Sequence, residues 1–173
     1  MFQHIDTLEL TICQALNRRL CLSGVRPFFT VVSRLGDGGF WYALMIALPL
    51  VYGWSAVPAA AQMAVTGAVA SGVYAFLKGR FVRERPYVTF ASIDCTVAPL
   101  DRYSFPSGHT LHAVCFSAVA MYHLPELGWL LVPFTTLVML SRVVLGLHYP
   151  TDVLAGSVIG LALATLSLAL LGV

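Results

Sequence analysis

Residues 58–78 read PAAAQMAVTGAVASGVYAFLK and are the clearest sign of what kind of protein this is. The stretch carries no charged side chain before Lys78. It is also long enough to cross the hydrocarbon core of a bilayer, which takes about 17–25 residues in a helix. A segment that crosses alone must satisfy its own backbone hydrogen bonds, so the stretch is predicted to be a transmembrane helix.

Four further stretches have the same character, and the composition of the whole chain agrees with them. The 173 residues are 58% hydrophobic and only 10% charged, whereas about 25% of residues are charged in a soluble protein. The sequence therefore predicts an all-α integral membrane protein, a helical bundle of five to six transmembrane helices. The additional predicted spans are residues 38–54, 107–124, 127–145 and 150–173.

Small residues recur in two of the predicted spans. Gly67 lies in the span 58–78, and Gly156 and Gly160 lie in the span 150–173. Because small residues allow helices to approach closely in a membrane, these two spans are expected to sit inside the bundle.

The first 37 residues have a different pattern. In residues 1–22 the apolar side chains gather near one helical face, with Asp6 and Glu9 mostly opposite. This pattern predicts an N-terminal amphipathic helix in the membrane interface. Residues 24–37 are too short to cross alone, but the two pieces together could form a sixth, re-entrant or broken helix. The acidic residues also interrupt any signal-peptide pattern, and residues 1–173 are expected to form a single membrane-embedded domain.

Counting the crossings brings the ionisable residues to one face of the membrane. The span 58–78 is followed by the one long polar connection, residues 79–106, so the next span begins on the same side. The chain crosses and returns, and the last span starts there again. Ionisable groups at the edges of spans are costly and by default suggest a functional site. The residues gathered at this face are Lys78, Arg85, Ser107, His109, Arg142, His148 and Asp152.

These side chains are the parts from which a phosphate site is built. Three of them are cations, and the two guanidinium groups are forked donors suited to oxyanions. Ser107 and Gly108 stand at a predicted helix start, where free backbone N–H groups and the helix dipole favour an anion. Histidines exchange protons near neutral pH, and Asp152 follows His148 by four residues, where it can orient that imidazole. The pattern predicts a phosphate cradle with a nucleophile, an orienting carboxylate and a separate acid.

The same residues carry a resemblance to the type 2 phosphatidic acid phosphatase superfamily of membrane lipid phosphatases. Its first motif, Lys-x6-Arg-Pro, is similar to KGRFVRERP at residues 78–86. Its second motif, Pro-Ser-Gly-His, is similar to PSGH at 106–109, and its third, Ser-Arg-x5-His-x3-Asp, to SRVVLGLHYPTD at 141–152. All three match in order and without a gap, and this combination is highly specific.

The resemblance implies a role for each motif residue. His148 is expected to attack phosphorus and form a phosphohistidine, with Asp152 orienting it. His109 is expected to protonate the leaving oxygen and then to activate water. The family uses no metal or other cofactor, and the chain shows no metal-binding pattern. The phosphoryl oxygens are expected to be held by Lys78, Arg85, Ser107, the Gly108 amide and Arg142.

The predicted function is that of a metal-independent membrane phosphatase acting on a lipid phosphate or diphosphate. Undecaprenyl diphosphate, phosphatidylglycerol phosphate, phosphatidic acid and a lipid A-type phosphate are all admissible substrates. A lipid-to-lipid phosphotransferase would use the same histidine, whereas a non-enzymatic anion-binding membrane protein needs no His148–Asp152 pair. The expected partners are the bilayer and its lipid phosphate. No basic patch suited to nucleic acid exists outside residues 76–87, and the sequence does not specify an oligomeric state.

Two expectations concern the surroundings of the site. Bacterial members of the superfamily mostly place it at the outer face, so the predicted location is a bacterial inner membrane with the site at the periplasmic face. The basic residues gathered on that face instead favour the cytoplasm by the positive-inside rule. Arg80 and Arg83, which lie outside the motif positions, are expected to meet lipid headgroups or water.

Overall fold

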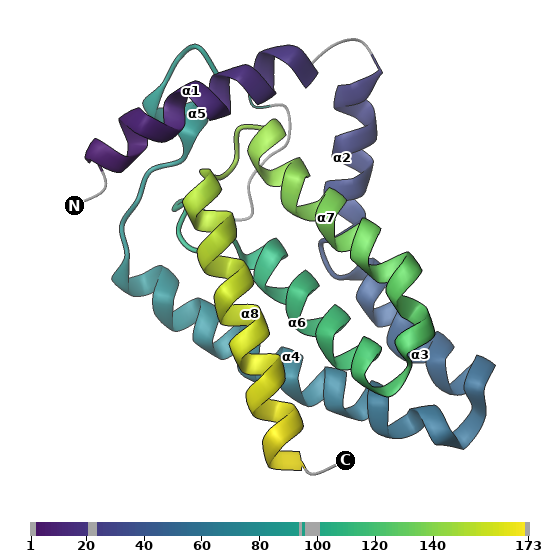
Figure 1. Cartoon of the computed structure of the whole chain (residues 1–173). Coiled ribbons are helices and arrows are strands. Elements are labelled where there is room, and N and C mark those ends of the chain that lie inside the picture. Colours follow the sequence, from purple (N-terminus) through teal and green to yellow (C-terminus); the bar gives the residue numbers. More distant parts are fainter. Residues whose placement is uncertain (1–2, 21–23, 94, 96–100, 172–173) are drawn as a thin grey trace.

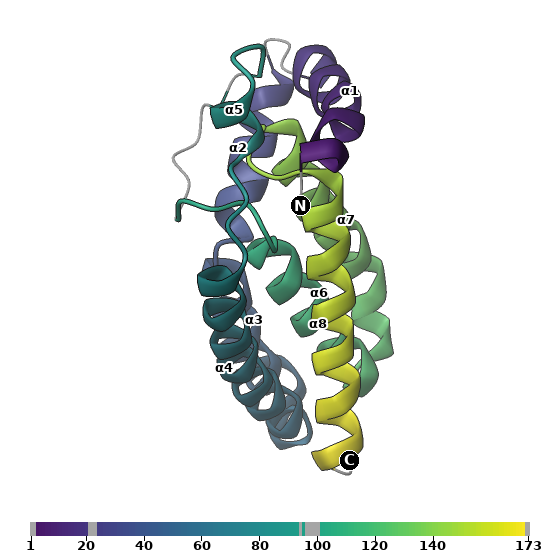
Figure 2. The same ribbon diagram turned by 90° about the vertical axis from the view of Figure 1, so that its left-hand side faces the viewer.

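A computed structural model describes residues 3–20, 24–93, 95 and 101–171, and all regular structure in this part of the chain is helical. Five long helices run along the length of the molecule, and the remaining elements are shorter or lie at its ends (Figures 1 and 2). In chain order the elements are α1 (Gln3–Leu20), α2 (Val25–Leu35), α3 (Gly39–Tyr52), η1 (Gly53–Ala56), α4 (Val57–Arg80), α5 (Pro86–Thr89), α6 (Gly108–His123), η2 (Pro125–Leu127), α7 (Gly128–Val144) and α8 (Pro150–Leu171).

The five predicted spans are confirmed as helices. They correspond to α3, α4, α6, α7 and α8, and each predicted end lies within two residues of the observed one. Three helical stretches of the described chain are long and apolar enough to cross a membrane, namely Gly39–Arg80, Pro125–Val144 and Pro150–Leu171. The first of these contains both α3 and α4, which are joined directly through η1. The chain reverses at η1, where Gly53 has a φ of 71°, a value that favours glycine.

The centre of the bundle is α6, which packs against α4, α7 and α8. The two glycine-bearing spans touch α6 closely, as expected. A Cβ atom at Gly67 would lie 2.5 Å from the Phe116 ring, and one at Gly160 would lie 2.4 Å from the carbonyl oxygen of Leu111. However, the expectation that α4 and α8 sit inside the bundle was wrong for the rest of their surfaces, since α8 exposes residues such as Val158 on its outer side. Small residues mark the face that meets a neighbour and not a helix enclosed on all sides.

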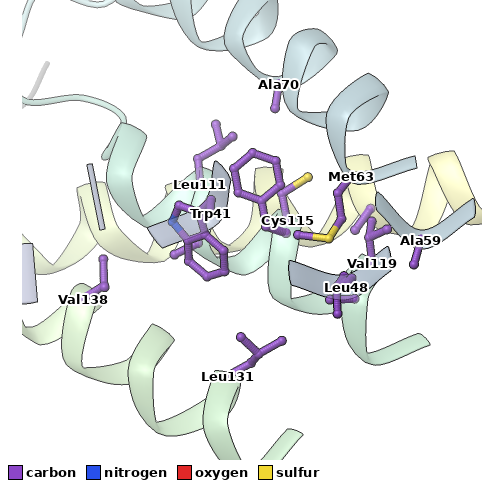
Figure 3. Close-up of a cluster of buried hydrophobic side chains, with 14 of the residues drawn as sticks. Trp41, Leu48, Ala59, Met63, Ala70, Leu111, Cys115, Val119, Leu131 and Val138 are labelled. Atoms are coloured by element: carbon purple, nitrogen blue, oxygen red, sulfur yellow. The ribbon is translucent and has the colours of Figure 1, made fainter. Parts of the chain in front are cut away.

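The apolar core fills the space between α3, α4, α6 and α7 (Figure 3). Its aromatic centre is Trp41, whose ring lies 5.4 Å from that of Phe116 and 5.6 Å from that of Phe134. Fully buried aliphatic side chains surround these rings. They are Leu48, Met63, Leu111, Val119, Leu131 and Val138.

The N-terminal helix α1 crosses the end of the bundle that lies opposite the C-terminus (Figure 1). A helix is present within the predicted segment 1–22. Its polar Glu9 and Asn17 are buried, whereas Leu8 and Ile12 are exposed. The inward side of α1 is mixed, because Glu9 pairs with a buried cation there while Leu10 and Leu16 pack against buried apolar side chains. Helix α2 is separate from α1 and packs along α7. Of the two expected forms, re-entrant or broken, the two helices correspond to the broken one.

The connection between α4 and α6, predicted as residues 79–106, lies at the same end of the molecule as α1 (Figure 1). In its described part it contains an extended segment, the short helix α5 and the residues 101–107 that lead into α6. The end of the bundle beneath α1 therefore receives the last turn of α4, the start of α6, the end of α7 and the start of α8.

Candidate active site

The sequence predicted that the motif residues gather at one end of the bundle, and in the structure they meet there. Four of them are less than 3% exposed, namely Arg85, Ser107, His148 and Asp152. An apolar chain that buries several ionisable groups in one place must pair them, because an unpaired buried charge is very costly. The contacts among these groups therefore define the site.

The imidazole of His148 lies between a carboxylate and a guanidinium. Its Nδ1 is 3.7 Å from Asp152 Oδ2, and its Nε2 is 3.3 Å from Arg85 Nη1. The distance from Nδ1 to Asp152 is longer than a hydrogen bond. The ring is nevertheless oriented with Nδ1 toward this carboxylate and Nε2 toward Arg85. Burial, followed by the charges of Arg142 and Arg85, lowers the pKa of His148 well below 6.5. The ring is therefore neutral near pH 7 and keeps the lone pair that a nucleophile needs.

Lys78 and Arg85 converge on one anion, the side chain of Asp101. Lys78 Nζ lies 3.0 Å and Arg85 Nη2 lies 2.8 Å from the same oxygen of this carboxylate, and Tyr74 donates its hydroxyl proton to the other oxygen. Burial alone would raise the pKa of Asp101, but the hydrogen bond from Tyr74 and the two positive charges lower it below 3.8. The two motif cations thus form a pocket that favours negative charge, and sequence reasoning had not identified its present occupant.

Arg142 anchors the turn that carries His148. Its side chain is buried and donates to the hydroxyl of Ser33 in α2, and its carbonyl oxygen accepts the N–H groups of Leu147 and His148, each at 3.0 Å. Gly146 has a φ of 70°, which the chain needs to turn from α7 toward His148 and which favours glycine.

The start of α6 is fastened to the start of α8. The N–H of Ser107 donates to the carbonyl oxygen of Asp152 at 3.1 Å, and the Ser107 hydroxyl lies 3.0 Å from that of Thr110. The expected N-cap position of Ser107 is confirmed, although its side chain makes no capping hydrogen bond. Gly108 faces the Tyr74 ring so closely that a Cβ atom would lie 2.7 Å from it.

His109 lies on the first turn of α6 and is half-buried. Its Nε2 is 3.2 Å from Oδ1 of Asp37, which stands in the turn between α2 and α3. Burial raises the pKa of Asp37 above 3.8, partly offset by the charge of Arg142. Sequence reasoning missed Asp37, although an acidic residue among the glycines of the segment GDGG is an unusual feature in so apolar a chain.

A cavity of about 460 Å³ opens beside His109, between α3, α4 and α6. Most of its walls are apolar or aromatic. The lining includes Trp41, Tyr42, Met45, Gly67, Tyr74, His109, His112 and Phe116.

Arg83 was expected to meet headgroups or water, and this prediction was wrong. Its side chain is only 2% exposed and lies among three carboxylates, one of which belongs to Asp152. Arg80 is exposed, as expected. The periodicity of the sequence offered no signal for the difference, because the partners of Arg83 come from α1 and α8. Within the described residues, no group of three or more His, Cys, Asp or Glu side chains is arranged to hold a metal ion.

Comparison with known proteins identifies the family. Residues 55–172 match the PAP2 superfamily. The chain is 33% identical over 86 residues to the undecaprenyl-diphosphatase BcrC of Bacillus subtilis (strain 168), a match covering 50% of this chain and 44% of that relative. It is 38% identical over 143 residues to a decaprenylphosphoryl-5-phosphoribose phosphatase of Mycolicibacterium smegmatis, covering 77% of this chain and 72% of the relative. The match thus spans less than half the length of the first relative.

The fold agrees with a solved member of the same superfamily. The crystal structure of a transmembrane PAP2 type phosphatidylglycerolphosphate phosphatase from Bacillus subtilis superposes with a TM-score of 0.79 and 25% sequence identity, covering 96% of this chain and 86% of that one. The sequence match and the shared helical arrangement together show that this chain belongs to the PAP2 superfamily of membrane lipid phosphatases.

Proposed function

We propose that the protein hydrolyses a lipid phosphate or diphosphate within the membrane, through a phosphohistidine formed on His148. The observation that carries the proposal is the setting of this ring. Its Nδ1 faces Asp152, and its Nε2 faces Arg85 in the pocket that also receives Lys78. A neutral imidazole with one nitrogen directed at a carboxylate and the other at an anion pocket is suited to nucleophilic attack on a bound phosphoryl group.

The proposed reaction takes two steps. In the first, His148 Nε2 forms a bond to phosphorus as the bond from phosphorus to the lipid oxygen breaks, and His109 gives its proton to that oxygen. In the second, water attacks the phosphohistidine while His109 accepts the proton of the water, and inorganic phosphate leaves. Lys78 and Arg85, now paired with Asp101, are placed to hold the phosphoryl oxygens in both steps. No metal takes part in this scheme.

The apolar cavity beside His109 supports a lipid as the rest of the substrate. A chain lying between α3 and α4 would keep its hydrocarbon in the cavity and in the bilayer, with the headgroup reaching the cations at the end of the bundle. Undecaprenyl diphosphate, phosphatidylglycerol phosphate, phosphatidic acid and a lipid A-type phosphate remain the candidates. The first two correspond to activities named for relatives of this chain.

The proposal includes a membrane arrangement for the single domain 1–173. Helices α3, α4, α6, α7 and α8 cross the bilayer, and α1 and α2 lie at the catalytic end, with exposed Leu8 and Ile12 of α1 in contact with lipid. We place this end at the periplasmic face of a bacterial inner membrane. Cys95 lies in the connection between α4 and α6, so a membrane-impermeant maleimide should label it in intact cells. Labelling only after lysis would place the site in the cytoplasm.

A phosphate-release assay tests the function. Purified protein in detergent is given a panel of the four candidate lipids, with the variant His148→Ala as a control. We expect release from at least one lipid, loss of release in the variant, and an acid-labile phosphoenzyme on His148 when a labelled substrate is quenched. Turnover by His148→Ala would refute the nucleophile. Release that depends on an added lipid acceptor would identify a phosphotransferase, and the absence of release from all four would leave an anion-binding protein.

A further inference from the structure

The side chain of Arg83 connects the N-terminal helix to the candidate active site. Its Nη1 donates to Asp152 Oδ1 at 2.6 Å and to Thr151 Oγ1 at 2.8 Å, and its Nη2 donates to Glu9 Oε2 at 2.7 Å and to Asp6 Oδ1 at 2.5 Å. The guanidinium also lies 3.9 Å from the centroid of the Tyr149 ring. All of its directions are therefore fixed by contacts from α1 and from the start of α8.

The contacts of Asp152 divide between its two oxygens. Oδ1 accepts from Arg83, whereas Oδ2 accepts the N–H of Tyr149 at 2.9 Å and faces Nδ1 of His148. A carboxylate held at one oxygen only can rotate about its Cβ–Cγ bond. The planar guanidinium on Oδ1 removes that freedom and so sets the direction in which Oδ2 meets the imidazole.

Helix α1 holds the other side of this arrangement. Glu9 binds Arg83 with one carboxylate oxygen, and its carboxylate also accepts the N–H of Thr151 at 2.6 Å and the Thr151 hydroxyl at 2.7 Å. Glu9 therefore satisfies a free backbone donor in the first turn of α8, one residue before Asp152. With Asp6, three carboxylates surround a single buried cation.

Such a cluster is a poor way to gain stability, because removing charged groups from water is costly and apolar packing would serve as well. We therefore propose that Arg83 is a positioning residue for the reaction, which acts by fixing the carboxylate of Asp152 toward His148, and that α1 completes the active site by holding Arg83 through Glu9 and Asp6. This inference rests on the proposed function, since it assigns Arg83 a part in the step that His148 performs.

Variants at Arg83 and Glu9 separate a positioning role from a merely structural one. We expect Arg83→Lys to lower kcat about 10-fold with KM little changed, because an ammonium group cannot bridge Asp152 and α1 as a fork does. Arg83→Met should lower kcat by about 100-fold, less than the roughly 10⁴-fold effect of losing an orienting carboxylate outright. It should also lower the melting temperature, because three carboxylates lose their cation.

The double variant Arg83→Met with Glu9→Gln is the decisive one. Removing one carboxylate should restore part of the melting temperature, but kcat should stay low because Oδ1 of Asp152 still lacks its guanidinium partner. Recovery of kcat together with the melting temperature would overturn the proposal, as would wild-type kcat in Arg83→Lys. Arg80→Met serves as the matched control, because Arg80 is exposed and its guanidinium lies 5.5 Å from the centroid of the Phe76 ring.

A second readout does not depend on turnover and keeps this proposal distinct from the proposed function. The rate at which diethyl pyrocarbonate modifies His148 is followed by mass spectrometry in the wild type and in the variants at Arg83 and Arg80. Arg83→Lys should increase the rate at His148 because the ring loses a fixed partner, while Arg80→Met should leave it unchanged. If no lipid phosphate is hydrolysed, the proposed function fails, and an unchanged modification rate in Arg83→Lys then sinks the positioning role separately.

Discussion

Replacing Gly156 by alanine tests whether the start of α8 holds the phosphate cradle in place. A Cβ atom at this position would lie 2.6 Å from the carbonyl oxygen of Ser107, which is 0.8 Å inside the 3.4 Å of an ordinary contact, and 3.3 Å from Cβ of Thr110. The nearest atom is backbone, so it cannot rotate away. Either α8 or the first turn of α6 must move by several tenths of an ångström.

The size of the expected effect follows from that displacement. Ser107 and Gly108 belong to the proposed phosphate cradle, and a misplacement of about 1 Å at a catalytic centre can lower the rate about 100-fold. A shift of this size at Ser107 should therefore lower kcat by about 10- to 100-fold. Overpacking of this kind also costs about 1–3 kcal/mol of stability, so the folded fraction must be measured alongside the rate.

Gly160→Ala is the matched comparison. Its Cβ atom would lie 2.4 Å from the carbonyl oxygen of Leu111, 1.0 Å inside an ordinary contact, and thus meets α6 one turn further from the site. Both variants make the same change in helix propensity. Phosphate release and melting temperature in detergent should show similar losses of stability, with the large loss of kcat confined to Gly156→Ala. Equal kcat values for the two folded variants would refute the link between this contact and the cradle. Gly72→Ala, whose Cβ atom meets nothing within 4 Å, should behave as the wild type.

Three further predictions follow from the site. Asp37→Asn removes the charged partner of His109 and should lower kcat about 10-fold for a lipid phosphate, and less for a p-nitrophenyl phosphate whose leaving group needs no proton; an equal loss for both would contradict the role of Asp37. Burial and neighbouring charges lower the pKa of His148, so its neutral form persists below pH 6.5. After correction for ionisation of the substrate, the inflection on the acid side of the kcat/KM profile should therefore lie below pH 6.5, and an inflection at or above pH 6.5 would contradict this prediction. Prolonged treatment with EDTA should leave phosphate release unchanged, and loss of activity that Mg²⁺ or Zn²⁺ restores would contradict the proposed reaction.

Much of the fold could be predicted because the membrane imposes simple rules on the sequence. Apolar length alone predicts the five long helices, and the parity of crossings predicts that Lys78, Arg85 and His148 lie at one end of the bundle. Glycines predicted close contacts, but they could not show that α6, and not α4 or α8, is the central helix. That outcome depends on all the faces of a helix, whereas a glycine stripe reports one.

The residues that sequence reasoning missed share a physical reason. Asp37, Asp101 and Glu9 each act on a partner far along the chain, and no local pattern distinguishes such an acid from one in water. The side of α1 that faces the bundle was hard to predict for the same reason, because it depends on partners far along the chain. Periodicity shows that a helix has an apolar and a polar side, but both lipid outside and a buried ionic cluster inside compete to decide which side turns inward.

The contact between Glu9 and Thr151 has a consequence for biogenesis. The two residues stand 142 positions apart, so α1 cannot reach its final partners until the start of α8 has been synthesised. A ribosome-bound intermediate that already contains the first two sequence motifs thus still lacks the contact between Glu9 and Thr151. This contact of the candidate active site therefore forms only after α8 has begun to be made.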